Sequence, residues 1–98
     1  MTVSQHLNYL VQELDKLGDS PDEIAFSLKQ EGIKGVVCYG RECPLANFAK
    51  KRGFTNPEFS SFYARSVETD YTYIPLKKSL RDFMSLFDQR LYPDLIGE

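Results

Sequence analysis

Apolar residues recur every three or four positions near the start of the chain, with polar residues between them. Their positions are Leu7, Leu10, Val11, Leu14 and Leu17. Because residues at this spacing lie on one face of a helix, the pattern predicts an amphipathic first helix. Gly18 follows the last apolar position and predicts the end of that helix.

The segment SPDE, residues 20–23, has the form of a second helix start. Ser20 fits the N-cap, Pro21 the first helical position, and Glu23 the position from which a side chain reaches back in a capping box. The helix is expected to bury Ile24, Ala25 and Leu28. Gly32 then predicts a left-handed stop.

The run IKGVVCYG, residues 33–40, is short, apolar and β-branched at its centre, and it lies between glycines. These features predict a buried strand from about Lys34 to Tyr39. Cys38 is expected to lie within that strand.

A third helix is expected next, because Pro44 suits a first helical position. Glu42 or Cys43 is the predicted cap, and Gly53 the predicted stop. The positions expected to be buried are Leu45, Phe48 and Ala49. Asn56 and Pro57 predict a loop over residues 54–60.

Residues 62–67 and 71–76 are rich in aromatic and β-branched residues, and the short gap between them predicts a hairpin. If Val67 lies opposite Tyr71, alternate residues fall on two faces. One face pairs Phe62 with Leu76, Ala64 with Ile74 and Ser66 with Thr72. The other face pairs Arg65 with Tyr73 and Val67 with Tyr71, and Tyr63 lies near these pairs on the same face. Pro75 cannot donate to a ladder, so its strand is expected to lie at an edge or to end there.

A last helical stripe runs towards Tyr92, and Pro93 is expected to close it. Its members are Leu80, Phe83, Met84, Phe87 and Leu91. The predicted order is α-α-β-α-β-β-α. We therefore expect an α+β fold in which a small three-stranded sheet has helices packed on one face.

The composition, 42% hydrophobic and 27% charged, is that of a globular protein. A chain of 98 residues has apolar surface for one core, so we expect a single domain over residues 1–98. The net charge of −2 gives no general attraction to nucleic acid or to an anionic membrane. We see no signal peptide and no stretch of the ~20 apolar residues that a membrane helix needs, so we expect a cytoplasmic protein without a membrane segment.

Both cysteines, Cys38 and Cys43, lie in one segment with four residues between them. A zinc site needs four ligands, and the single histidine, His6, is more than thirty residues away. The sequence therefore predicts no metal and no cofactor.

Cys43 is the more informative cysteine, because a helix N-terminus favours a thiolate and Arg41 adds positive charge. This pair is a candidate nucleophile or anion anchor, and a small cysteine-dependent enzyme or anion-binding protein is the alternative function. Glu42 brings an opposing charge, and free cysteines are usually buried as small hydrophobes. We therefore favour a capping and packing role for Cys43.

The second face of the predicted hairpin is a candidate interaction surface of Tyr63, Arg65, Tyr71 and Tyr73. Tyrosine and arginine are enriched at interface hot spots, which favours a protein partner or self-association. The tyrosines and the basic runs also leave nucleic-acid binding as a weaker alternative, opposed by the acidic balance. The remaining alternative is that the first helix covers this face.

Two blocks, EGIKGVVCYGRECPLANFAKKRG and LRDFMSLFDQRLYPDL, resemble a pattern of short uncharacterised bacterial and phage-type proteins. In that pattern a G-I-x-G-V strand precedes C-P-[LIV]-A, and the chain ends F-D…Y-P-x-L. The resemblance implies no activity. It implies shared framework positions at Cys43, Pro44, Leu45, Ala46, Phe87, Asp88, Tyr92 and Pro93.

These observations contain no constellation of acid, base and nucleophile. We therefore expect a non-enzymatic protein-interaction or regulatory module.

Overall fold

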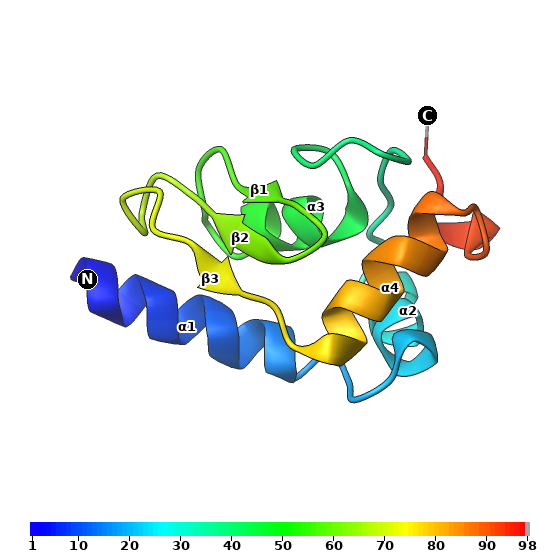
Figure 1. Ribbon diagram of the computed structural model, residues 1–98, viewed down its shortest axis with the longest axis horizontal. Helices are drawn as coiled ribbons and strands as arrows, with labels where there is room; N and C mark the ends of the chain where they lie inside the picture. The colour runs from blue at the N-terminus through cyan, green and yellow to red at the C-terminus, as the bar shows by residue number, and fades with distance from the viewer. Residues whose placement is uncertain (98) are drawn as a thin grey trace.

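The computed structural model describes residues 1–97, and Figure 1 shows its mixed α+β arrangement. The helices are α1 (Val3–Asp15), α2 (Pro21–Gln30), α3 (Pro44–Lys51), α4 (Lys78–Asp88) and the closing 3-10 helix η1 (Pro93–Leu95). The strands are β1 (Glu58–Phe59), β2 (Tyr63–Arg65) and β3 (Ile74–Pro75), which form one antiparallel sheet in the order β1-β2-β3. The predicted α+β class and three-stranded sheet are confirmed.

Side-chain caps define the starts of the first three helices. Thr2 caps α1 in a capping box, and the Ser20 hydroxyl accepts from the backbone N–H of Glu23 at 3.2 Å to begin α2. The Glu23 carboxylate reaches back to the N–H of Asp19, at 2.8 Å, one residue before the N-cap that we predicted. Cys43 is the N-cap of α3. The sequence therefore placed the starts of α2 and α3 correctly.

The predicted strand at residues 34–39 is wrong, because this segment forms a loop with a single bridge. Gly35 pairs in parallel with Ile96 across the molecule. Cys38 adopts a φ of 61°, in the left-handed region, which turns the chain out of any extended conformation. Cys38 is accordingly exposed rather than part of a buried strand.

The glycine at position 35 is required by close packing of backbone on backbone. A Cβ atom there would lie within 2.5 Å of the Cys43 carbonyl carbon and still nearer the backbone nitrogen of Pro44. The N–H of Val36 donates to the carbonyl of Glu42 at 2.8 Å and closes the loop. The glycine that appeared to bound a strand therefore allows the loop to pack on the start of α3.

The third strand is supplied by Glu58–Phe59, within the segment predicted as a loop. It pairs Glu58 with Arg65, while Ala64 pairs with Ile74 on the other side of β2. The latter pairing confirms the hairpin register predicted from the alternating pattern. β3 ends at Pro75 and forms an edge of the sheet, as its proline predicted.

The core lies between the inner face of the sheet and the four helices. Its fully buried aromatic residues are Phe48, Phe59, Phe83 and Phe87. In Figure 1 the sheet lies in front of α3, while α4 packs most extensively against α2. Two residues predicted in helical stripes are exposed, namely Val11 on α1 and Leu91, which follows the end of α4.

Candidate functional site

The four residues predicted to form an interaction surface come together on the outer face of the sheet. We call Tyr63, Arg65, Tyr71 and Tyr73 the tyrosine surface. The rings of Tyr63 and Tyr73 pack with centroids 4.2 Å apart, at an interplanar angle of 43°. The Arg65 guanidinium carbon lies 5.7 Å from the ring centroid of Tyr71 and 5.6 Å from that of Tyr73. Arg65 therefore lies within cation–π distance of two of the tyrosines.

Glu58 orients Arg65 from the neighbouring strand. Its Oε1 accepts from Arg65 Nε at 2.8 Å, and its Oε2 accepts from Arg41 Nε at 3.2 Å. Partial burial opposes ionisation of this carboxyl, but the bonds from the two arginines outweigh it and hold the pKa of Glu58 below its usual value. Two cations around one carboxylate leave the cluster with a local excess of positive charge.

Sequence reasoning missed Glu58, because it lies in a segment predicted as a loop. A signal was present in the sequence, since the polar Glu58 lies between the apolar Pro57 and Phe59, and the structure buries both of these neighbours. This buried-polar-buried alternation is typical of a strand with one face in the core.

The tyrosine surface is open to solvent. Tyr71 is 44% exposed and Tyr73 58% exposed, so α1 leaves this face uncovered. Phe62, at the β1–β2 turn, is also exposed, by 67%, although the predicted register places it on the other face of the hairpin. The alternative in which the first helix covers the tyrosines is therefore not realised.

Cys43 lies in the core at the start of α3. Its side chain is 1% exposed, and its Sγ accepts from the N–H of Ala46 at 3.4 Å. Burial, together with the nearby charge of Asp88, raises the pKa of the thiol from 9.0 to about 11. Arg41, the predicted charge partner, instead pairs with Glu58. The geometry favours the capping and packing role over the nucleophile.

Cys38 has different surroundings, on an exposed turn. Its backbone N–H donates to Asp88 Oδ1 at 2.9 Å, which ties the turn to the end of α4. Among residues 1–97, no three His, Cys, Asp or Glu side chains are grouped so that they could hold a metal ion.

The two blocks that carry the resemblance meet in space. Gly35 donates its N–H to the carbonyl of Leu95 at 2.8 Å, and Gly97 donates to the carbonyl of Gly35 at 3.0 Å. With the bond from Cys38 to Asp88, these contacts join the 35–43 loop to the C-terminal segment. The two segments, far apart in the sequence, therefore contact each other in the folded chain.

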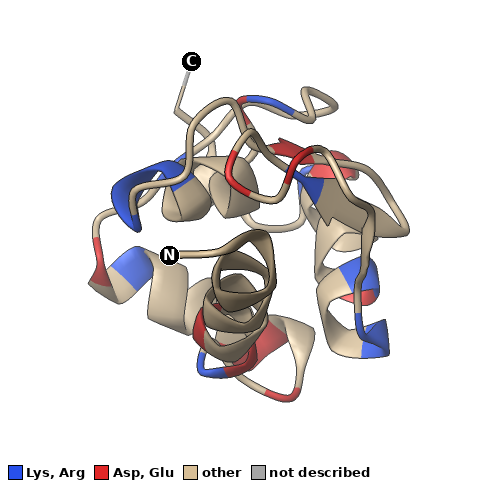
Figure 2. Ribbon diagram, turned by 90° about the vertical axis from the view of Figure 1, so that its left-hand side faces the viewer, with Lys and Arg blue, Asp and Glu red and all other residues tan. Residues whose placement is uncertain are grey.

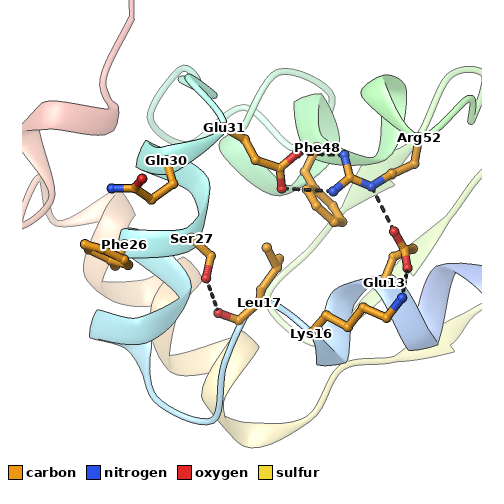
Figure 3. A pocket seen from close by; sticks show the side chains of 9 residues that line it. All are labelled: Glu13, Lys16, Leu17, Phe26, Ser27, Gln30, Glu31, Phe48 and Arg52. Carbon is orange, nitrogen blue, oxygen red and sulfur yellow. Dashed lines mark hydrogen bonds and ion pairs between the residues drawn. The ribbon is translucent and has the colours of Figure 1, made fainter.

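A hollow lies between α1, α2 and α3, with a volume of about 280 Å³ (Figure 3). Arg52 donates to Glu31 through Nη1 at 2.7 Å and Nη2 at 2.9 Å, and to Glu13 through Nε at 3.0 Å. Its guanidinium also lies 4.4 Å from the centroid of the Phe48 ring. Arg52, at the end of α3, therefore joins that helix to the end of α2 through Glu31 and to α1 through Glu13.

The basic run that includes Arg52 is engaged within the protein. Lys50 donates to the carbonyl of Arg41 at 2.8 Å, and Lys51 lies 3.4 Å from the Glu31 carboxylate. Figure 2 shows basic and acidic segments interspersed on this side of the molecule. Glu13 and Glu31 thus offset part of the positive charge of the basic run within the protein.

The chain matches no protein-family model, no curated protein and no solved structure. Within residues 1–97, no helix has both the length and the apolar character required to span a bilayer.

Proposed function

We propose that this protein is a non-enzymatic interaction or regulatory module that binds a protein partner through the tyrosine surface. The observation that carries the proposal is the exposed grouping of tyrosine rings around Arg65. Tyrosine and arginine are among the residue types most enriched at interface hot spots. Tyrosine also supplies a large contact area at a low cost in side-chain entropy.

Contacts within the protein prepare this surface for binding. Glu58 holds Arg65, and Arg65 lies against two of the rings, so these side chains are already restricted before a partner arrives. Binding therefore loses less side-chain entropy than it would with free side chains. The excess positive charge around Glu58 favours a partner that presents acceptor or acidic groups at the centre of its contact.

Site-specific crosslinking tests the proposal. A photo-reactive phenylalanine analogue at position 73 should crosslink one partner in the native host, and the same analogue at the exposed position 11 should not. The partner, identified by mass spectrometry, is then purified and its affinity measured by calorimetry. Tyr73→Ala should weaken binding about 30-fold, the loss typical of a hot-spot tyrosine.

The matched control is Phe26→Ala, which removes another exposed aromatic side chain from a different face. It should leave the affinity for the partner unchanged. If Tyr73→Ala and Tyr63→Ala both bind with wild-type affinity while remaining folded by circular dichroism, the tyrosine surface is not the binding site.

The other two functional classes make different predictions. A nucleic-acid ligand would lose affinity steeply with added salt, because binding would release counterions. A cysteine enzyme would need Cys43 to reach its substrate as a thiolate, and its burial and raised pKa disfavour that state.

A further inference from the structure

The outer face of α2 is an exposed stripe that the helices and sheet leave uncovered. Its members follow one another at i, i+1, i+4, i+7 and i+8, and they are Asp22, Glu23, Phe26, Lys29 and Gln30. All five are exposed, and the Phe26 side chain at the centre is 63% exposed. A single exposed aromatic side chain is common on protein surfaces, so the surroundings of Phe26 decide whether it marks a contact site.

Hollows lie on both sides of Phe26. On one side is the hollow of about 280 Å³ described above, which Leu17 and Phe48 also line. On the other is a hollow of about 190 Å³ that includes Leu91 and Tyr92. Figure 3 shows Phe26 and Gln30 on the side of α2 away from Arg52. The ring is therefore a projection with space on each side to receive another apolar group.

The charges along this face are arranged to match a reversed copy of the same helix. The first turn carries Asp22 and Glu23, and the last turn carries Lys29. Two copies of α2 that pack antiparallel about a two-fold axis at Phe26 would place Asp22 of each copy beside Lys29 of the other. Glu23 would then lie beside Gln30, and the two Phe26 rings would meet at the axis.

We propose that the protein forms a symmetric homodimer through the outer face of α2, centred on Phe26. Such an interface is isologous, because one surface contacts an identical copy of itself. This proposal uses a different face from the tyrosine surface and stands or falls independently of it.

The contacts now made by these charges leave them free to join such an interface. Lys29 pairs with Asp94 at 2.9 Å, but the two side chains are 61% and 70% exposed. Asp22 accepts from the Tyr92 hydroxyl at 2.7 Å through Oδ1. A carboxylate has two oxygens, so Asp22 retains acceptor capacity for a lysine of the second copy.

The size of the α2 face determines the affinity expected for the dimer. A helix of ten residues is about 15 Å long, so the contact is smaller than a standard protein interface. We therefore expect a dimer of micromolar or weaker affinity, which weakens further as salt screens the paired charges.

Sedimentation velocity from about 10 µM to about 1 mM tests the proposal on the full chain. The wild type should pass from monomer to dimer with concentration. Phe26→Ala should raise the dimer dissociation constant about 30-fold, as expected for a central anchor. Tyr73→Ala is the matched control and should dimerise like the wild type.

A charge exchange tests the predicted orientation. Lys29→Glu and Asp22→Lys each place like charges together in their own homodimer, so each should weaken self-association at least about tenfold. A mixture of the two variants pairs opposite charges at both places and should recover dimerisation. Circular dichroism before mixing confirms that each variant is folded.

Three results would overturn the proposal. One is a wild type that stays monomeric at the highest concentration, and another is a dimer that Phe26→Ala leaves intact. The third is a mixture of the two charge variants that dimerises no better than either alone.

Discussion

Cys43 is predicted to resist alkylation for as long as the protein stays folded. Its side chain is 1% exposed, and burial raises the pKa of its thiol from 9.0 to about 11. Because iodoacetamide reacts with the thiolate, a rise of two pKa units alone lowers the reactive fraction at neutral pH about 100-fold. The enclosing core must also open before the reagent can reach the sulfur.

The expected protection follows from how rarely a folded domain opens. A domain stable by about 5 kcal/mol is unfolded in roughly one molecule in several thousand. If alkylation of Cys43 requires that opening, its rate in the native protein should be about 10³ to 10⁴ times lower than in the denatured protein.

The assay is iodoacetamide labelling at neutral pH, followed by intact-mass spectrometry. The Cys38→Ser variant isolates Cys43, and the same variant in denaturant gives the reference rate. Cys43→Ser provides the matched exposed thiol, because only Cys38 remains and it should label quickly. Labelling of native Cys43 within tenfold of the denatured rate would refute the burial argument and favour the nucleophile.

Four further outcomes follow from the same contacts. Below pH 9.0 the Cys43 thiol is protonated and its contribution to the stability of the fold is complete. As the pH rises towards its folded pKa of about 11, chemical denaturation should show that the free energy of unfolding falls by about 2–3 kcal/mol. The Cys43→Ser variant should not show this fall. Hydrogen bonds from Arg52 lower the pKa of Glu31, so stability should fall as the pH drops below 4.5, and Glu31→Gln should flatten that fall in urea titrations. Gly35→Ala should cost about 3 kcal/mol or more by thermal unfolding, since its Cβ would overlap backbone that cannot move. Cys38→Gly should stabilise by about 0.5 kcal/mol, because glycine adopts the left-handed φ of 61° without strain; a lower melting temperature would contradict this.

The hairpin could be predicted because the alternation of residues in both strands and the short gap between the strands agree on one register. Pairing Ala64 with Ile74 places the small and apolar residues of both strands on one face, whereas a slip of one residue would reverse the faces, and the structure has this pairing. The helix starts were equally readable, because Ser20 and Pro44 carry their meaning within one turn of the chain.

The 34–39 segment was misread because its conformation depends on residues far away in the sequence. Its apolar, β-branched run satisfies the local pattern of a buried strand. Its only bridge within residues 1–97, however, joins Gly35 to Ile96, and the N–H of Cys38 is held by Asp88 at the end of α4. Local patterns do not report such long-range partners, and a glycine that permits close packing looks the same as one that bounds a strand.

The two proposed surfaces also differ in how directly a local sequence pattern indicates them. The tyrosine surface was predictable, because period-two alternation places its residues on one side of a hairpin. Phe26 lies off the buried stripe of Ile24 and Leu28, so the core gains nothing from it, and exposing its ring to water is unfavourable. A single aromatic residue off the buried stripe is common on protein surfaces. Here it coincides with hollows on both sides and with a charge order that matches its own reversal, which points to a second copy of the chain.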